Sequence, residues 1–120
     1  NVTKAKNIKQ ARSVAFTVAE SPLVKTAMFG SDANWGRILS AIGRDKTVED
    51  INKLEIRLNR QPLVKKGFIH PKYSEKLASR AMKKKEIEIE IILGLGKQGF
   101  EVMTSDLSED YVLINSDYRS

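Results

Sequence analysis

The stretch EIEIEIIL at residues 86–93 decides the fold class of this chain, because it alternates apolar and charged side chains over almost its whole length. In a strand, successive side chains point to opposite faces of the sheet. Four apolar side chains therefore share one face, and glutamates occupy the other as far as Ile92. The pattern predicts a strand with one buried and one solvated face. The apolar face comprises Ile87, Ile89, Ile91 and Leu93.

The next six residues, GLGKQG at 94–99, match the glycine spacing of a dinucleotide-binding loop. Such a loop must lead into a helix whose amino-terminal end binds the pyrophosphate. The residues that follow, FEVMTSD at 100–106, have strand character instead. We therefore expect the glycines to form a hairpin connection to a second strand that begins near Phe100.

Three helices are predicted in the first third of the chain. Apolar residues recur with helical spacing over residues 5–20, which indicates an amphipathic helix. Ser21 is a suitable N-cap for a second helix, which has Pro22 in its first turn and ends at Gly30. A third helix is expected over about residues 32–43.

The middle of the chain combines both kinds of element. Apolar and charged residues alternate at 54–58, which predicts another strand with one solvated face, and residues 77–82 predict a helix. The loosest segment is expected at residues 59–73. Together the elements favour an α+β fold, with helices packed on a mostly antiparallel sheet. Residues 1–120 are expected to form a single domain.

Composition limits the chemistry available to this chain. Cysteine is absent, so disulfides and thiolate catalysis are excluded. Because His70 is the only histidine, a zinc site built from the usual ligands is not expected, and we predict no metal and no cofactor. No stretch approaches the roughly 20 apolar residues of a membrane span. We expect no membrane partner and a cytoplasmic location.

The charge balance raises nucleic acid as a partner, since the net charge is +6 and the pI is about 9.6. Residues 1–60 carry 11 basic and 6 acidic side chains, and residues 61–120 carry 10 and 9, so the excess is spread out. The densest cluster, at 83–85, lies where a helix is expected to end, and cations are favourable there. Few aromatic residues accompany the basic ones, so no base-stacking surface is evident. We predict no nucleic-acid partner.

The final residues, YVLINSDYRS at 111–120, begin with four apolar side chains and then become polar. Disordered ends are usually poor in aromatic and branched apolar residues. The apolar run at 111–114 therefore predicts a strand-like segment that is fixed to the protein, so that the last groups can serve in a site.

Three blocks of the sequence resemble one family. SPLVKTA at residues 21–27, DANWGRI at 32–38 and INSDYRS at 114–120 resemble, in the same order, three blocks of the ornithine acetyltransferases, the glutamate N-acetyltransferases of arginine biosynthesis. Ala33 stands where that family usually has proline. The resemblance implies an enzyme that cuts its own precursor before a threonine and uses that threonine as nucleophile. An acetyl group then passes from N-acetylornithine to the threonine and on to glutamate.

The resemblance also implies that this chain works with other polypeptides. Asn1 has no hydroxyl or thiol and cannot be the nucleophile. The chain resembles the carboxyl-terminal part of the family's beta chain, in a larger α/β assembly of two chains. We therefore expect partners from the same precursor, namely an alpha chain and the rest of the beta chain, in a heterotetramer of two alpha and two beta chains. No catalytic residue is assigned to this chain.

Two substrate-binding residues are implied by the matching carboxyl-terminal block. Asn115 offers amide donors and an acceptor for the amino-acid end of ornithine or glutamate, and Ser120 offers a hydroxyl. Asn115 could instead be a turn residue that satisfies its own backbone. Lys25 is read as a helix-surface cation, and the residues NWGR at 34–37 as structural support for the site.

Two alternative functions remain open. The chain could be a small basic nucleic-acid-binding module. It could also be a purely structural piece of the acetyltransferase, in which the tail packs but does not contact substrate.

Overall fold

The helices form where the sequence supplies both a cap and an apolar face. Each of the first four begins after an Asn or Ser whose side-chain oxygen accepts a hydrogen bond from the backbone N–H three residues later. Gly30 ends the second helix, as predicted. The N-caps are Asn7, Ser21, Asn34 and Ser74. The helices are α1 (Ile8–Ala19), α2 (Pro22–Phe29), α3 (Trp35–Gly43), α4 (Glu75–Ala81) and α5 (Glu109–Asp117).

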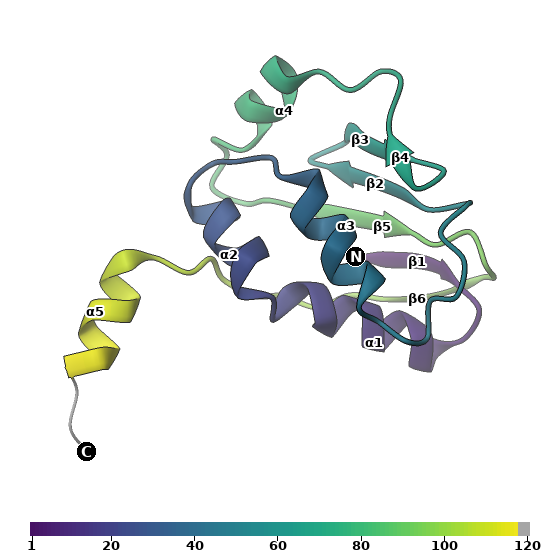
Figure 1. The fold of residues 1–120 in the computed structure, drawn as a ribbon, viewed down its shortest axis with the longest axis horizontal. Coiled ribbons are helices and arrows are strands. Elements are labelled where there is room, and N and C mark those ends of the chain that lie inside the picture. The colour runs from purple at the N-terminus through teal and green to yellow at the C-terminus, as the bar shows by residue number, and fades with distance from the viewer. Residues whose placement is uncertain (118–120) are drawn as a thin grey trace.

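The computed structural model describes residues 1–117, and its strands form one mixed sheet (Figure 1). The sheet order within these residues is β4-β3-β2-β5-β1-β6. Every neighbouring pair is antiparallel except β1 and β5, which are parallel. The predicted class, helices packed on a mostly antiparallel sheet, is confirmed. The strands are β1 (Val2–Ala5), β2 (Glu55–Leu58), β3 (Gln61–Lys65), β4 (Phe68–Ile69), β5 (Ile89–Ile92) and β6 (Gln98–Phe100).

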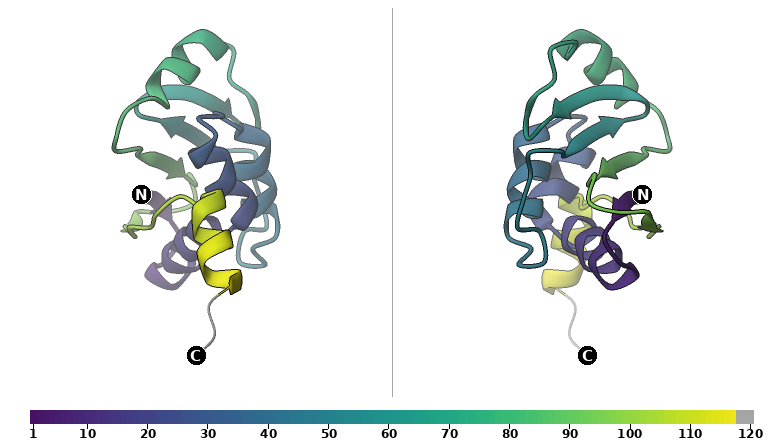
Figure 2. Two further views of the ribbon diagram at one scale, coloured as in Figure 1. Left: turned by 90° about the vertical axis from the view of Figure 1, so that its left-hand side faces the viewer. Right: turned by 90° about the vertical axis from the view of Figure 1, so that its right-hand side faces the viewer.

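The core lies between the sheet and a layer formed by α1, α2 and α3 (Figure 2). Helix α1 packs on β1 and β6 and also contacts α2 and α3. In β2, Ile56 and Leu58 are fully buried while Arg57 is exposed, which confirms the predicted solvated face. Helix α4 stands at the other end of the sheet and packs against β3.

Strand β1 corrects the expectation that a helix begins near residue 5. Residues Val2–Ala5 form an interior strand, and Val2 and Ala5 are fully buried. Val2 pairs with Ile91 on one side and with Phe100 on the other. A four-residue strand shows too little alternation to be separated from the helix that follows it.

The prediction that residues 59–73 are the loosest segment is wrong, because they contain β3 and β4. Two tight turns build this hairpin pair, at residues 59–60 and 66–67, and all four turn residues have positive φ. Such turns match the twist of antiparallel strands, but they usually carry Asn-Gly or Asp-Gly, which this segment lacks. Pro62 is tolerated beside a bulge that leaves Leu63 as an extra residue opposite β2.

The glycine-rich segment 94–99 does not form the predicted hairpin. It joins β5 to β6, but β1 lies between those two strands, so the connection passes over the end of β1. Gly96 comes so close to β1 that an added Cβ would lie 2.5 Å from the Ala5 carbonyl oxygen. The backbone N–H groups of Leu95 and Gly96 both donate to the carbonyl of Lys4. Strand β6 and not a helix comes directly after the glycines, so the segment lacks the dinucleotide-binding context.

Strand β5 is shorter than the predicted 86–93. Its antiparallel partner β2 ends at Leu58, which pairs with Ile89. The chain then turns away at residues 59–60, so residues before Ile89 have no strand of the described part beside them on that side. Ile87 and Ile89 are only half buried, and both line a cavity on the face of the sheet.

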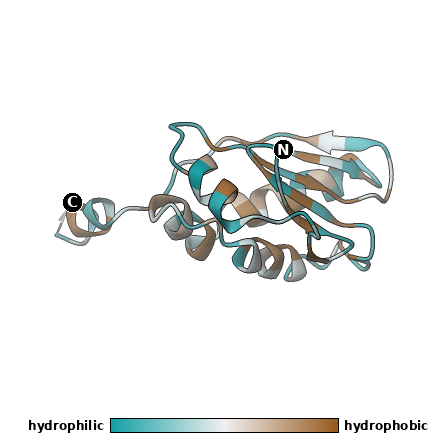
Figure 3. Cartoon of the chain, turned by 90° about the horizontal axis from the view of Figure 1, so that it is seen from above, coloured by the Kyte–Doolittle hydropathy of each residue, from teal (hydrophilic) through white to brown (hydrophobic). Residues whose placement is uncertain are grey.

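The carboxyl-terminal tail differs most from the sequence prediction. Residues 111–114 lie in helix α5 and not in a strand, and the backbone N–H of Tyr111 donates to the Ser108 hydroxyl at 3.1 Å. A helix satisfies its backbone locally, whereas a strand here would need a neighbouring strand. None of the nine residues of α5 is buried, so this segment is not fixed to the rest of the chain as predicted. Figure 3 shows the helix beside the C label standing apart from the body.

Candidate functional site

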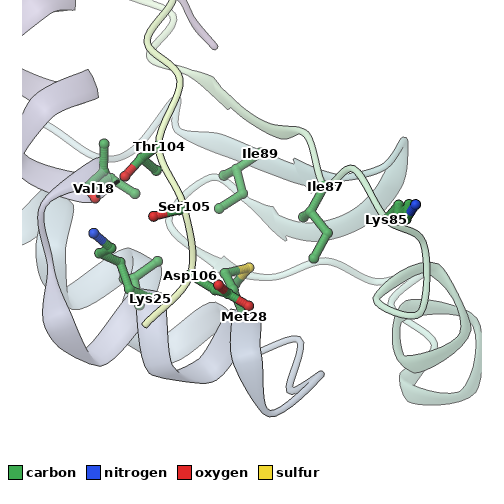
Figure 4. Close-up of a pocket in the computed structure, with 11 residues that line it drawn as sticks. Val18, Lys25, Met28, Lys85, Ile87, Ile89, Thr104, Ser105 and Asp106 are labelled. Atoms are coloured by element: carbon green, nitrogen blue, oxygen red, sulfur yellow. Dashed lines mark hydrogen bonds between the residues drawn. The ribbon is translucent and has the colours of Figure 1, made fainter. Parts of the chain in front are cut away.

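A groove runs between α1, α2, the residues that enter β5 and the segment at 101–108, which we call the linking segment (Figure 4). It comprises a cavity of about 390 Å³ and an adjoining one of about 560 Å³ that shares part of the same lining. Most of the lining residues are apolar. Apolar residues of the groove include Val18, Val24, Met28, Ile87 and Ile89; polar ones include Lys25, Lys85, Thr104, Ser105 and Asp106.

The linking segment forms one wall of this groove and is held by few hydrogen bonds. The Thr104 hydroxyl donates to the Ala19 carbonyl at 3.3 Å, and the Leu107 N–H donates to the Lys25 carbonyl at 3.3 Å. Both acceptors belong to α1 or α2. The segment therefore carries the chain from the sheet edge across these helices to α5.

Lys25 is half buried at this wall, close to the linking segment in Figure 4. Within residues 1–117 the only ion pair joins Arg57 to Glu55, so Lys25 has no carboxylate partner among them. A cation beside an apolar groove can attract a carboxylate. The sequence reading of Lys25 as a plain surface cation did not include the groove, because Thr104 to Asp106 reach it from the far end of the chain.

The sequence blocks at residues 21–27 and 32–38 are joined by hydrogen bonds between α2 and α3. Arg37 of α3 donates through Nη1 to the Leu23 carbonyl at 2.9 Å and to the Thr26 hydroxyl at 3.3 Å, both in α2. Asn34 caps α3, and its amide donates to the Asp32 carboxylate at 3.0 Å. Trp35 is half buried against the core. These contacts support the reading of residues 34–37 as structural support for the helix layer that walls the groove.

A buried carboxylate fixes the end of α3 onto α1. Asp45 accepts hydrogen bonds from Ser13 at 2.7 Å, from Thr17 at 3.4 Å, and from the Thr47 hydroxyl and N–H at 2.6 and 2.8 Å. Burial by itself would raise the pKa of Asp45, but the donors of Thr47, Ser13 and Thr17 outweigh it and the pKa is lowered. Sequence reasoning missed this cluster, which has no local motif.

Asn115 lies on α5, away from the groove lining. Its side-chain amide donates to the Tyr111 carbonyl one turn earlier at 2.8 Å, and the residue is exposed. One N–H of the Asn115 amide is thus used on the local backbone, as expected if Asn115 were a turn residue. The residue lies in a helix, however, and not in a turn. The Oδ1 acceptor makes no hydrogen bond with the described residues and can meet another group. Ser120, the second predicted substrate-binding residue, lies outside the described residues.

Comparison with known proteins identifies the family. The family model described as "ArgJ family" matches residues 1–120. The chain belongs to the ArgJ family. This match confirms the resemblance to the ornithine acetyltransferases.

Relatives in the ArgJ family are similar along the whole chain. The arginine biosynthesis bifunctional protein ArgJ of Bradyrhizobium diazoefficiens is 48% identical over 119 residues, which cover 99% of this chain and 29% of that protein. The protein of the same name from Nitrobacter winogradskyi is 48% identical over 110 residues, which cover 92% of this chain and 26% of that protein. The chain thus spans less than a third of the length of these curated relatives.

A solved structure of the ArgJ family has the same fold. The crystal structure of the arginine biosynthesis bifunctional protein argJ from Bacillus halodurans matches with a TM-score of 0.90 at 34% identity. The match covers 98% of this chain and 55% of the solved chain. Since 2% of 120 residues is only about two, the alignment extends into α5.

Two further properties bear on the site. Residues 1–117 contain no group of three or more His, Asp or Glu side chains that could hold a metal ion. None of the helices within those residues is long and apolar enough to cross a membrane.

Proposed function

We propose that this chain is the carboxyl-terminal, single-domain part of a cytoplasmic acetyltransferase that moves an acetyl group from N-acetylornithine to glutamate in arginine biosynthesis. The observation that carries the proposal is the ArgJ family match over residues 1–120, together with relatives at 48% identity that are named for arginine biosynthesis. Family membership favours this transferase over the nucleic-acid-binding alternative.

The proposed reaction proceeds through an acyl-threonine in another part of the protein. The threonine hydroxyl attacks the acetyl carbonyl, an ester forms, the amide C–N bond breaks, and the hydroxyl proton passes to the departing α-amino group of ornithine. The α-amino group of glutamate then attacks the ester, forms N-acetylglutamate and restores the hydroxyl. The nucleophile would come from the partner polypeptides, the alpha chain and the rest of the beta chain, in a heterotetramer.

The contribution proposed for this chain is to hold the amino-acid end of the substrate. Asn115 is exposed and retains an acceptor and a second N–H, which suit the ammonium and carboxylate groups of an amino acid. The Ser120 hydroxyl would add a further hydrogen-bonding group for the substrate.

The first test compares Asn115→Ala with Ser116→Ala in the full-length protein. Both residues are exposed on α5, and each makes one local hydrogen bond to the backbone; the Ser116 bond is 3.0 Å long. Loss of a hydrogen bond to a charged substrate group should lower kcat/KM about 10- to 100-fold in Asn115→Ala, equivalent to about 1.5–3 kcal/mol. Ser116→Ala should stay within about twofold of the parent.

The readout is steady-state transfer from N-acetylornithine to glutamate, with subunit composition checked by intact mass. Equal kinetics in both variants, with assembly unchanged, would remove the binding role and favour the purely structural alternative. Absence of a threonine-started polypeptide in the purified protein would contradict the acyl-threonine mechanism itself.

A further inference from the structure

The end of the sheet that lies opposite α5 carries a dense cluster of lysines (Figure 1). Four short segments meet at this end, and together they hold six exposed lysines and no aspartate or glutamate. Arg57 and Glu55 form the only ion pair within residues 1–117, so none of the six lysines pairs with a carboxylate of those residues. The segments are KAKN at 4–7, INKL at 51–54, KKGF at 65–68 and GLGK at 94–97. We name as the lysine rim Lys4, Lys6, Lys53, Lys65, Lys66 and Lys97.

Direct backbone contacts hold these four segments side by side. The carbonyl of Lys4 accepts hydrogen bonds from two N–H groups of the segment 94–97, at 2.8 and 3.0 Å. That segment also lies so close to Lys53 that a Cβ added at its first glycine would be 2.8 Å from the Lys53 Cβ. The Gly67 N–H donates to the Leu54 carbonyl at 3.2 Å. The lysine rim is therefore one continuous surface, and like charges gathered on one surface add up to a positive potential that attracts anions.

Two residues of the lysine rim have a backbone conformation that lysine does not favour. The φ angles of Lys4 and Lys66 are both 53°, in the left-handed region. Glycine adopts this region without steric cost, and asparagine adopts it more readily than other residues with a side chain. Backbone strain of this kind gathers at functional sites. The fold thus gives no reason for lysine at either position, which favours a role for the charged side chains themselves.

An apolar group lies within the same four segments. Phe68 is 75% exposed and Ile51 is 39% exposed. Ile51 packs on the turn before Phe68, since a Cβ added at Gly67 would lie 3.2 Å from the Ile51 Cδ1. An aromatic anchor with charged residues around it is typical of protein–protein contacts. Nucleic acid fits this surface less well, because the lysine rim contains no arginine and one phenylalanine offers no row for stacked bases.

We propose that the lysine rim binds an acidic segment of another protein, and that Phe68 and Ile51 anchor a large apolar side chain of that segment. The lysines attract the carboxylates and guide the approach, and the apolar pair holds the bound segment in register. Asn115 takes no part, because α5 lies away from this end of the sheet (Figure 1). The inference goes beyond the proposed acetyl transfer and does not depend on it.

A defined probe tests this interaction in the full-length protein. The probe is a fluorescent, glutamate-rich peptide with one central leucine, and fluorescence anisotropy measures its binding at physiological salt. The double variant Lys65→Glu, Lys66→Glu should weaken binding at least about tenfold, because it replaces attraction by repulsion. The control is the double variant Lys83→Glu, Lys84→Glu, which changes the net charge equally at two exposed lysines after α4.

The control residues lie at the other end of β2, since Asn59 of the turn that follows β2 donates to the Ala81 carbonyl at the end of α4. Charges more than about 8 Å apart are largely screened at physiological salt, so the control should bind within about twofold of the parent. Equal weakening by the two double variants would overturn the proposal, because net charge alone would then explain binding. Tighter binding of an oligonucleotide of the same charge would also overturn it and favour nucleic acid.

A substitution to glycine separates the charge of the lysine rim from its fold. Lys66→Gly removes one cation and relieves the left-handed backbone, so thermal stability should not fall while peptide binding weakens about two- to fivefold. A stable Lys66→Gly protein that binds like the parent would contradict the proposal.

Labelling of the unaltered full-length protein with an amine-reactive reagent gives a test without substitutions. The lysine rim and the control pair, Lys83 and Lys84, should all react in the free protein, because all are exposed. The peptide should then protect the lysine rim and not the control pair. A lysine rim that resists the reagent without peptide would show that the protein itself covers this surface, which overturns the proposal.

Discussion

Helices α3 and α5 have the same length, nine residues, and opposite surroundings. Helix α3 buries Ile38, Ala41 and Ile42, whereas α5 buries none of its residues. The buried residues of α3 follow the i, i+3, i+4 spacing that places side chains on one face. The apolar residues of α5 are consecutive and face in all directions.

This difference shows that spacing, more than the number of apolar residues, decides whether a helix joins its own body. One stripe can be covered by a single neighbouring layer. Helix α3 packs against α1 and α2, and its buried residues belong to the core that these helices share with the sheet. A helix without a stripe gains little from lying on the same surface.

The largest expected effect comes from removing the same side chain in the two helices. Ile42 is fully buried, and Ile114 is 68% exposed. Ile42→Ala should lower the free energy of unfolding of the body by about 2–5 kcal/mol, because it leaves a cavity in the core. Ile114→Ala should change it by less than about 0.5 kcal/mol. Exchange of the slowest β2 amides reports both values. Similar losses would mean that α5 belongs to the body after all.

A smaller effect is expected at the carboxylate that ties the end of α3. In Asp45→Asn, an NH2 group replaces one carboxylate oxygen and would face donors instead of accepting from them. The free energy of unfolding should therefore fall by about 1–3 kcal/mol at neutral pH. Asp50→Asn is the control, since Asp50 is exposed and its recorded side-chain bond is only to the N–H of Asn52. Denaturant unfolding measures both variants.

The same pair predicts a pH dependence. Because the folded-state pKa of Asp45 is lowered, its contribution is complete above the unfolded value of about 4 and is lost as the pH falls through the folded value. The stability gap between the parent and Asp45→Asn should therefore narrow from pH 5 to pH 2. A constant gap over this range would show that the ionised form is not the one that holds α3.

The smallest expected effect is a difference in stability between alanine variants of Asn34 and Asn115. Asn34→Ala removes the N-cap of α3 and should cost about 1 kcal/mol of body stability. Asn115→Ala lies inside α5, where alanine is the better helix former, so the same measurement should show no loss. Thermal unfolding of the two variants compares them directly. A loss at Asn115 as large as that at Asn34 would show that its side chain has a structural role.

Sequence reasoning succeeded where the signal was local. The Ser21 cap, Pro22 in the first turn and Gly30 at the end of α2 are all within one helix, and the structure contains each of them. Alternation at 54–58 likewise predicted the buried and solvated sides of β2. These features depend on neighbours along the chain, so a pattern can report them.

Reasoning failed where distant residues decide. Val2 is a strand residue because Ile91 and Phe100 flank it, and nothing near Val2 announces them. The carboxyl-terminal block indicated Asn115 as a site residue, which remains a prediction. Sequence did not show that Asn115 lies on a helix, because strand and helix both accommodate a short apolar run.

By itself, the sequence determined the family, the class of fold, the caps of the early helices and the faces of the main strands. Only the tertiary structure decided the insertion of β1 between β5 and β6, the groove beside Lys25 and the projection of α5. The first set follows from side-chain chemistry and spacing within a few residues. The second set depends on which distant segments pair and which surface each segment can cover, and those choices are made by the packed chain as a whole.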